Sequence, residues 1–284
     1  MTQTPVPFRK MNGLGNDFVV LDARAEAIPM SDEIARVIAD REDGVGCDQL
    51  IVMEPSRPGA DVFMRIRNWD GAEVSACGNA TRCVAAVIAS ETGRADVTVE
   101  TNAGLLPSRV NGDGTVTVDM GAPKFGWDDI PLSEEFRDTR AIELEMGPPG
   151  APLIHSPSVV NVGNPHAIFW VDDLDVVDLS KAGPLLENHP LFPERANISL
   201  ARVDGPDQIT VRVWERGVGL TRACGTAACA VAVAAARTKR TGRSVTIVLP
   251  GGPLRLDWRE DDHILMTGPW ADDGPGLLDP AFFA

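Results

Sequence analysis

The sequence predicts a mixed α/β (α+β) protein made of two similar domains. The tripeptide Ala-Cys-Gly occurs at residues 76–78 and again at residues 223–225. In both places a run of small residues follows, at 83–89 and 229–236, and such alanine-rich runs favour helix. The residues around each copy also recur in the same order, which indicates a duplicated domain.

The duplication can be followed along both halves of the chain. The offset between the two cysteines aligns residues 64–66 with 211–213 and Asn68 with Glu215. An offset one residue longer aligns Asn16 with Asn164 and Gln49 with Asn197. Polar residues therefore recur at matched places around each cysteine. A pair of domains related by a pseudo-twofold axis would place the two helix N-termini on either side of one cleft.

Length and composition agree with a globular protein of two domains. The chain has 284 residues, enough for two domains of about 100–150 residues each. Hydrophobic residues make up 44% and charged residues 24% of the chain. The net charge of −15 argues against nucleic acid or an anionic membrane as a partner.

The termini and cysteines predict a cytoplasmic protein. Residues 1–5 lack the basic start and apolar run of a signal peptide. The longest apolar run, 229–236, is far shorter than the ~18 residues of a membrane span. An odd number of cysteines, five, indicates reduced thiols.

In the first half the apolar patterning predicts short strands separated by polar turns. Strands are expected at 8–11, 18–22, 50–53, 62–67, 97–100, 105–110 and 116–119. Turns are expected at 12–17 and 111–114, the second closing a hairpin. Ser31 is predicted to cap a helix that runs to about Asp40.

The chain between residues 121 and 157 has a different composition. Six prolines and several glycines interrupt any regular element there, so we place the crossing between domains near its start. The predicted domains are residues 1–122, with Cys77, and residues 123–268, with Cys224. The second half should repeat the order strand, helix, strand, loop, cysteine, helix, strands.

Cys77 and Cys224 are the predicted catalytic residues. Each stands where a helix begins, and the following Gly78 or Gly225 lets a ligand approach the backbone closely. The N–H groups at a helix start bind a carboxylate, and their field favours the thiolate over the thiol. Two such thiols suit proton removal from one face of an α-carbon and proton return to the other face, which inverts the stereocentre.

The remaining cysteines have a simpler interpretation. Cys47, Cys83 and Cys229 lie outside the repeated cysteine–glycine position and are predicted to be small buried residues. The spacing of the cysteines does not match paired zinc ligands, and no C-x-x-C redox motif occurs.

The polar residues near the matched positions are candidates for binding a zwitterion. Glu215 and Arg216 follow an apolar strand and suit an ammonium and a carboxylate, respectively. The asparagines 12, 16, 68, 164 and 197 are each typical turn residues that together offer neutral donors and acceptors. Two roles remain open for His166, namely a structural hydrogen bond or tuning the pKa of a nearby thiol; Glu215 is a second candidate for tuning.

The chain resembles the diaminopimelate epimerase family over nearly its whole length, and seven motifs carry this resemblance. They are KMNGLGNDF (10–18), DGVGCDQ (43–49), ACGN (76–79), GNPH (163–166), RAN (195–197), ERGVG (215–219) and ACGT (223–226). Members of this family interconvert LL- and meso-diaminopimelate without a cofactor. The resemblance implies two domains, each a mostly antiparallel sheet curled around a central helix, with the active site between them.

The resemblance also implies roles for individual residues. Cys77 and Cys224 match the two catalytic bases. The matched substrate contacts are Asn12, Gln49, Asn68, Gly78, Asn79, Asn164, Asn197, Glu215, Arg216, Gly225 and Thr226. A homodimer, a small-molecule amino-acid substrate and a role in lysine and peptidoglycan precursor synthesis are implied as well. The tail 269–284 is expected to pack on the first domain.

Three other functions are compatible with paired cysteines. The first is a related proline or hydroxyproline racemase, against which Arg216 and the asparagines argue because proline has no second charged end. A module that only captures an amino acid is the second. The third is a redox protein whose working state is a disulfide between Cys77 and Cys224.

Overall fold

The computed structural model describes residues 4–283, and the chain forms two compact units. The first unit contains Met1–Asp119 and Gly268–Ala284, and the second contains Met120–Thr267. The prediction of a cytoplasmic protein rests partly on residues 1–5. Of these, residues 1–3 lie outside the described residues.

The first unit is built on one sheet. Its strands, in spatial order, are β1 (Val6–Gly13), β2 (Asn16–Asp22), β3 (Gln49–Glu54), β4 (Val62–Asn68), β6 (Asp96–Thr101), β7 (Gly104–Val110) and β8 (Val116–Asp119). β5 (Glu73–Val74) pairs with β4, and β19 (Ala271–Leu278) pairs with β1. These pairings are antiparallel except β2 with β3 and β4 with β6.

The second unit repeats this plan. Its strands are β11 (Ser158–Asn161), β12 (Pro165–Trp170), β13 (Asn197–Gly205), β14 (Gln208–Glu215), β16 (Ser244–Leu249), β17 (Gly252–Trp258) and β18 (Ile264–Gly268), with β15 (Gly219–Thr221) on β14. The parallel pairs, β12 with β13 and β14 with β16, again interrupt an antiparallel sheet at the corresponding places. The prediction of two pseudo-symmetric domains is therefore confirmed.

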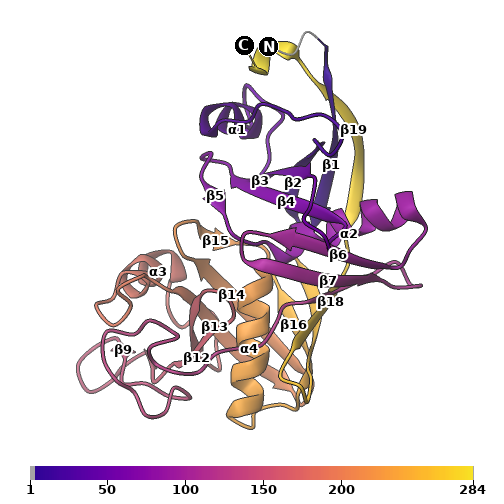
Figure 1. The fold of residues 1–284 in the computed structure, drawn as a ribbon. Coiled ribbons are helices and arrows are strands. Elements are labelled where there is room, and N and C mark those ends of the chain that lie inside the picture. Colours follow the sequence, from indigo (N-terminus) through magenta and orange to yellow (C-terminus); the bar gives the residue numbers. More distant parts are fainter. Residues whose placement is uncertain (1–3, 284) are drawn as a thin grey trace. The chain divides into compact units, whose positions relative to one another are not determined.

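One buried helix lies in the middle of each unit (Figure 1). α2 (Gly78–Thr92) packs against β1, β4, β6, β7 and β8, and α4 (Gly225–Arg237) packs against β11, β12, β13, β16 and β17. Eleven consecutive residues of α2 are buried, as are ten of the thirteen residues of α4. Most of the buried side chains of these helices are small, which lets the strands pack closely around them and explains the alanine-rich runs; Arg82 of α2 is a large buried exception. The predicted fold class is confirmed.

Each unit also has an outer helix. α1 (Asp32–Ala39) packs against β3 and β4, and α3 (Leu179–Glu187) packs against β13, β14 and β15. Ser31 caps α1 as predicted, because its hydroxyl accepts a hydrogen bond from Ile34 N at 3.1 Å. A short 3-10 helix, η1 (Pro280–Phe283), packs against α1. None of the described helices combines the length and the apolar character that crossing a membrane requires.

Two stretches differ from their sequence-based expectation. The turn expected at 12–17 is only Leu14 and Gly15, because β1 and β2 remain paired up to Gly13 and Asn16. Leu14 and Gly15 have φ values of 59° and 80°, as a tight hairpin turn requires. The proline-rich segment 121–157 contains only β9 (Glu145–Met146) and β10 (Ile154–His155), yet it contributes to the core of the second unit.

The close packing of α3 on β14 gives the first prediction. A Cβ added at Gly183 would lie 2.4 Å from the ring of Trp214. Alanine gains about 1 kcal/mol of helix propensity over glycine, but overpacking a core costs about 1–3 kcal/mol. Gly183→Ala should therefore lower the free energy of unfolding in urea. Gly242→Ala is the control because nothing lies within 4 Å of its added Cβ; equal stability of both variants would contradict the prediction.

Candidate active site

Cys77 stands at the start of the central helix of the first unit. It is the N-cap residue of α2, with an extended backbone (φ −148°, ψ 108°), and its side chain does not cap the helix. The sulfur instead lies 3.9 Å from Oδ1 of Asn16. The sulfur of Cys77 thus lies beside an amide oxygen and does not cap α2.

Asn16 orients the groups around Cys77. Its Nδ2 donates to Asp48 at 3.0 Å, and its Oδ1 accepts from Asn79 Nδ2 at 3.3 Å. Asn16 was expected to be a turn residue that, with four other asparagines, offers donors and acceptors to a zwitterion, but it was not among the substrate contacts implied by the family resemblance. Its repeat partner Asn164 was included, so the repeat itself was the signal that could have identified Asn16.

Two further predicted residues of this unit bond to each other. Gln49 begins β3 and Asn68 ends β4, and these two residues are register partners. Gln49 Nε2 donates to Asn68 Oδ1 at 2.9 Å, which fixes both amides. Among the described residues, nothing donates a hydrogen bond to the buried Gln49 Oε1. This buried oxygen is an available acceptor, since buried polar atoms normally have partners.

Asn12 lies at the end of β1 and is held by the C-terminal strand of the chain. Its Nδ2 donates to Asp273 Oδ2 at 2.9 Å, and its carbonyl faces the Cys83 sulfur at 3.5 Å. Trp69, which follows Asn68, is 59% exposed. The pairing of β19 with β1 thus brings the chain's end to one of the predicted substrate contacts.

Cys224 has the same position in the second unit but different surroundings. It is the N-cap of α4, is buried, and its sulfur accepts a hydrogen bond from Ala227 N at 3.4 Å. Thr226 Oγ1 lies 3.5 Å from the same sulfur.

The two helix starts were expected to favour thiolates, and for Cys224 this expectation is wrong. Burial raises the pKa of the Cys224 thiol well above its usual value, and the negative charge of Glu215 raises it further. Loss of water and a nearby carboxylate outweigh the field of the helix and the hydrogen bonds from Ala227 and Thr226. At neutral pH this sulfur carries its proton.

Asn197 fixes the loop that follows Glu215. Its Oδ1 accepts from Arg216 N at 3.0 Å, and its Nδ2 donates to the carbonyl of Pro165 at 2.9 Å. Glu215 ends β14 and accepts a hydrogen bond from Thr221 Oγ1. The side chain of Arg216 donates to the carbonyl of Glu194 at 2.9 Å. Asn197 thus fixes the backbone at Arg216, directly after Glu215.

His166 bonds to Asn164. Its Nε2 lies 2.7 Å from Asn164 Oδ1, so Nε2 carries the proton of the neutral ring. Burial lowers the pKa of His166 to about 3, with a further contribution from the charge of Arg216. A neutral histidine at this position orients the Asn164 amide.

Glu187 is a positioning residue that the sequence analysis missed. It lies on α3, is 5% exposed, and accepts hydrogen bonds from Trp214 Nε1 at 2.7 Å, Gly217 N at 2.9 Å and Arg195 at 3.2 Å. Trp214 and Gly217 directly flank Glu215 and Arg216. A glutamate at the end of a helix gives no sequence signal of burial, because such residues are usually exposed.

Burial keeps two of the other cysteines, Cys47 and Cys83, as protonated thiols. Burial raises the pKa of Cys47 to about 11 and that of Cys83 to about 12. All five cysteines lie within residues 4–283 and are thiols rather than disulfides. In that part of the chain no group of three or more His, Cys, Asp or Glu side chains is arranged to hold a metal ion.

Fold and site together define a class of protein with two like units, each presenting a cysteine at the start of a central helix. Solved structures with the same fold include a hydroxyproline epimerase from Agrobacterium vitis, at 16% identity and a TM-score of 0.69, covering 98% of this chain and 93% of that one. A phenazine biosynthesis protein of the PhzF family from Bacillus anthracis has 18% identity and a TM-score of 0.68, covering 98% of this chain and 100% of that one.

The family is shown by sequence. The profile of diaminopimelate epimerase matches residues 8–126 and 158–271. A diaminopimelate epimerase of Nitrobacter hamburgensis is 59% identical over 280 residues, covering 98% of this chain and 96% of the relative. One of Brucella anthropi is 56% identical over 281 residues, covering 98% and 93%. The chain belongs to the diaminopimelate epimerase family, which confirms the resemblance inferred from its motifs.

The surroundings of Cys224 give a prediction about pH. A thiol is neutral below its pKa, so a raised pKa means that the thiolate forms only at higher pH. Glu215→Gln removes the neighbouring negative charge and should shift the titration of Cys224 to lower pH. Thiolate ultraviolet absorbance during a pH titration measures this, as the difference between each protein and its Cys224→Ser counterpart. An unchanged or upward shift would refute the role of Glu215.

The three hydrogen bonds of Glu187 give a prediction about stability. Glu187→Ala should lower the free energy of unfolding by about 2–4 kcal/mol, because buried donors lose a charged acceptor. Glu187→Gln keeps one oxygen and should fall between alanine and the parent. Urea unfolding measures the effect, with the exposed Glu143→Ala as control. A loss no larger than that of the control would show that Glu187 does not hold the loop.

Proposed function

We propose that this protein interconverts LL- and meso-2,6-diaminopimelate by inverting the configuration of one α-carbon with two cysteine bases. The single observation that supports the two-base scheme is the matched position of Cys77 and Cys224, each directly before the central helix of its unit. Membership of the diaminopimelate epimerase family supports the substrate.

The reaction needs one basic and one protonated sulfur. A thiolate takes the α-proton, the electron pair delocalises into the carboxylate, and the second thiol gives its proton to the opposite face of the carbon. The raised pKa of Cys224 keeps its thiol protonated at neutral pH, which suits the proton donor. In that direction of the reaction Cys77 is the base, and in the reverse direction the two roles exchange.

The α-carbon of an amino acid is a very weak acid, so the developing charge must be stabilised. We assign this task to the backbone N–H groups of Gly78, Asn79, Gly225 and Thr226. They belong to the first turns of α2 and α4, where N–H groups lack intrahelical acceptors and the helix dipole favours an anion. Donors that are fixed before the reaction are the most effective kind of charge stabilisation.

The polar side chains of both units would recognise the rest of the substrate. Glu215 suits an ammonium group and Arg216 a carboxylate. The buried Gln49 Oε1, which lacks a donor among the described residues, suits an N–H of the substrate. The remaining proposed contacts are Asn12, Asn68, Asn164 and Asn197.

Several properties of the whole protein follow as proposals from the family resemblance. We propose that residues 1–122 with the tail 269–284, and residues 123–268, are the two epimerase domains. The protein would act in the cytoplasm as a homodimer, on a small-molecule amino acid, without a cofactor, and supply lysine and peptidoglycan precursors.

The cysteine variants test this function. Cys77→Ser and Cys224→Ala should each reduce epimerisation of diaminopimelate at least about a hundredfold, the usual size of a general acid–base contribution. Cys83→Ala is the matched control from helix α2 and should stay near the parent rate. Turnover and α-hydrogen exchange in deuterated water measure the effect, with circular dichroism to confirm folding.

Three results would contradict the proposal. Parent-like turnover by either active-site variant would reject the two-thiol scheme. Faster turnover of proline or hydroxyproline than of diaminopimelate would assign the other racemase activity. Binding of an amino acid without exchange of its α-hydrogen would indicate a binding module and not an enzyme.

A further inference from the structure

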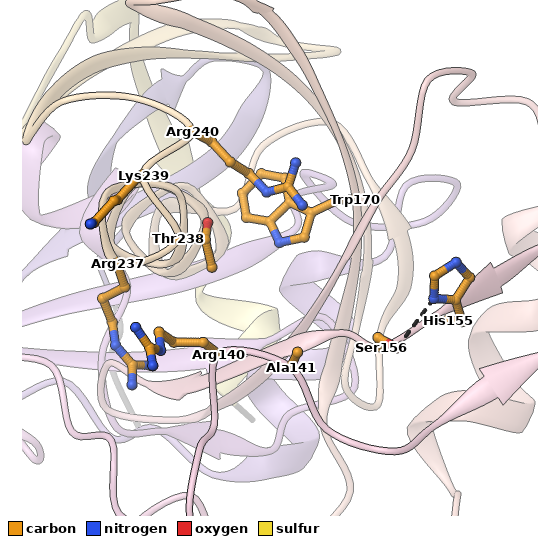
Figure 2. Close-up of a pocket in the computed structure, with 9 residues that line it drawn as sticks. All are labelled: Arg140, Ala141, His155, Ser156, Trp170, Arg237, Thr238, Lys239 and Arg240. Carbon is orange, nitrogen blue, oxygen red and sulfur yellow. Dashed lines mark hydrogen bonds between the residues drawn. The ribbon is translucent and has the colours of Figure 1, made fainter.

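Four cations surround one pocket in the second unit, at the C-terminal end of α4 (Figure 2). The pocket has a volume of about 520 Å³, and none of its nine lining residues is acidic. Its cations are Arg140, Arg237, Lys239 and Arg240. Cys224 lies at the other end of this 13-residue helix, about 20 Å away at 1.5 Å per residue. The pocket is therefore separate from the proposed catalytic residues.

Arg237 is fixed in place but incompletely satisfied. Its guanidinium lies over the Phe125 ring at 3.9 Å, and its Nη2 donates to Thr139 Oγ1 at 3.2 Å. Its Nη1 is buried, and no acceptor for it exists among the described residues. Burial lowers the pKa of Arg237, and the charge of Arg140 lowers it further against the opposing effect of Asp138. A buried charged donor without an acceptor is costly and normally has a partner.

The other arginines are also held toward the pocket. Arg240 lies over the ring of Trp170 at 4.6 Å, and Arg140 is paired with Asp138 at 2.7 Å. Figure 2 shows the guanidiniums of Arg140 and Arg237 on one side of the pocket and that of Arg240 above Trp170. The dipole of α4 favours cations at its C-terminal end, which accounts for Arg237 and Lys239. It does not account for Arg140, which comes from the segment before β9.

Lys239 occupies a backbone position that favours glycine. Its φ is 58°, in the left-handed region, and its N–H closes the helix end by donating to the carbonyl of Ala236 at 3.1 Å. Glycine is the usual residue at this position because it has no Cβ. A lysine here adds strain to the backbone and a charge to the pocket, and such strained positions cluster at binding sites.

We propose that this pocket binds a small molecule bearing two or more oxyanion groups, either phosphates or carboxylates. Arginine guanidiniums bind both kinds of oxyanion through paired N–H donors, and the lysine adds a point charge. The volume is within the range of about 300–1,000 Å³ for ligand pockets. An oxyanion in the pocket also relieves the repulsion between Arg140 and Arg237.

Calorimetric titration of the full chain with inorganic pyrophosphate tests the proposal, with citrate as a carboxylate probe. We expect saturable binding of at least one probe, with one site per chain. Lys239→Gly and Arg240→Gln should each weaken binding about tenfold through loss of a charged contact. Arg109→Gln is the control, since Arg109 is an exposed arginine of β7 paired with Asp96, and this variant should bind like the parent.

The design separates lost binding from lost folding. Glycine adopts the left-handed conformation of residue 239 without strain, so Lys239→Gly should unfold at a temperature no lower than the parent. Tighter binding of pyrophosphate identifies phosphate as the ligand chemistry, and tighter binding of citrate identifies carboxylate. Failure of both probes to saturate would overturn the proposal. Binding that the two pocket variants leave unchanged, or that Arg109→Gln weakens equally, would also overturn it.

Discussion

The constraint on which each unit depends is a helix buried on every side. Strands pack closely around a helix when most of its side chains are small, and α2 and α4 accordingly consist largely of alanine and other small residues. Cys77 and Cys224 are the N-cap residues of these helices and have similar extended backbones.

The two helix starts differ in chemistry although they match in geometry. The Cys224 sulfur is buried and lies in the field of Glu215, and both effects favour the protonated thiol. Cys77 is less buried and lies beside the neutral amide of Asn16. A helix N-terminus alone therefore does not decide the protonation of a cysteine, because burial and neighbouring charge affect the thiol more strongly here. The raised pKa of Cys224 suits the thiol that gives its proton in the proposed reaction.

The side chains proposed to contact substrate are mostly held by hydrogen bonds to other protein groups. Gln49 holds Asn68, His166 holds Asn164, and Asn197 holds the backbone of Arg216. Glu187 supports the same loop from α3. Because these polar groups are already oriented, binding would require little ordering of side chains, which is one source of affinity and rate.

The sequence by itself determined the duplication, the helices that follow each cysteine, most strands and the family, because these depend on local pattern and on spacing along the chain. Gly78 and Gly225 marked the helix starts for the same reason. Only the tertiary structure decided the roles of Asn16 and Glu187, the raised pKa of Cys224 and the cationic pocket beside α4. Each of these depends on burial or on contacts between residues far apart in the chain, and neither burial nor long-range contact can be read from neighbouring residues.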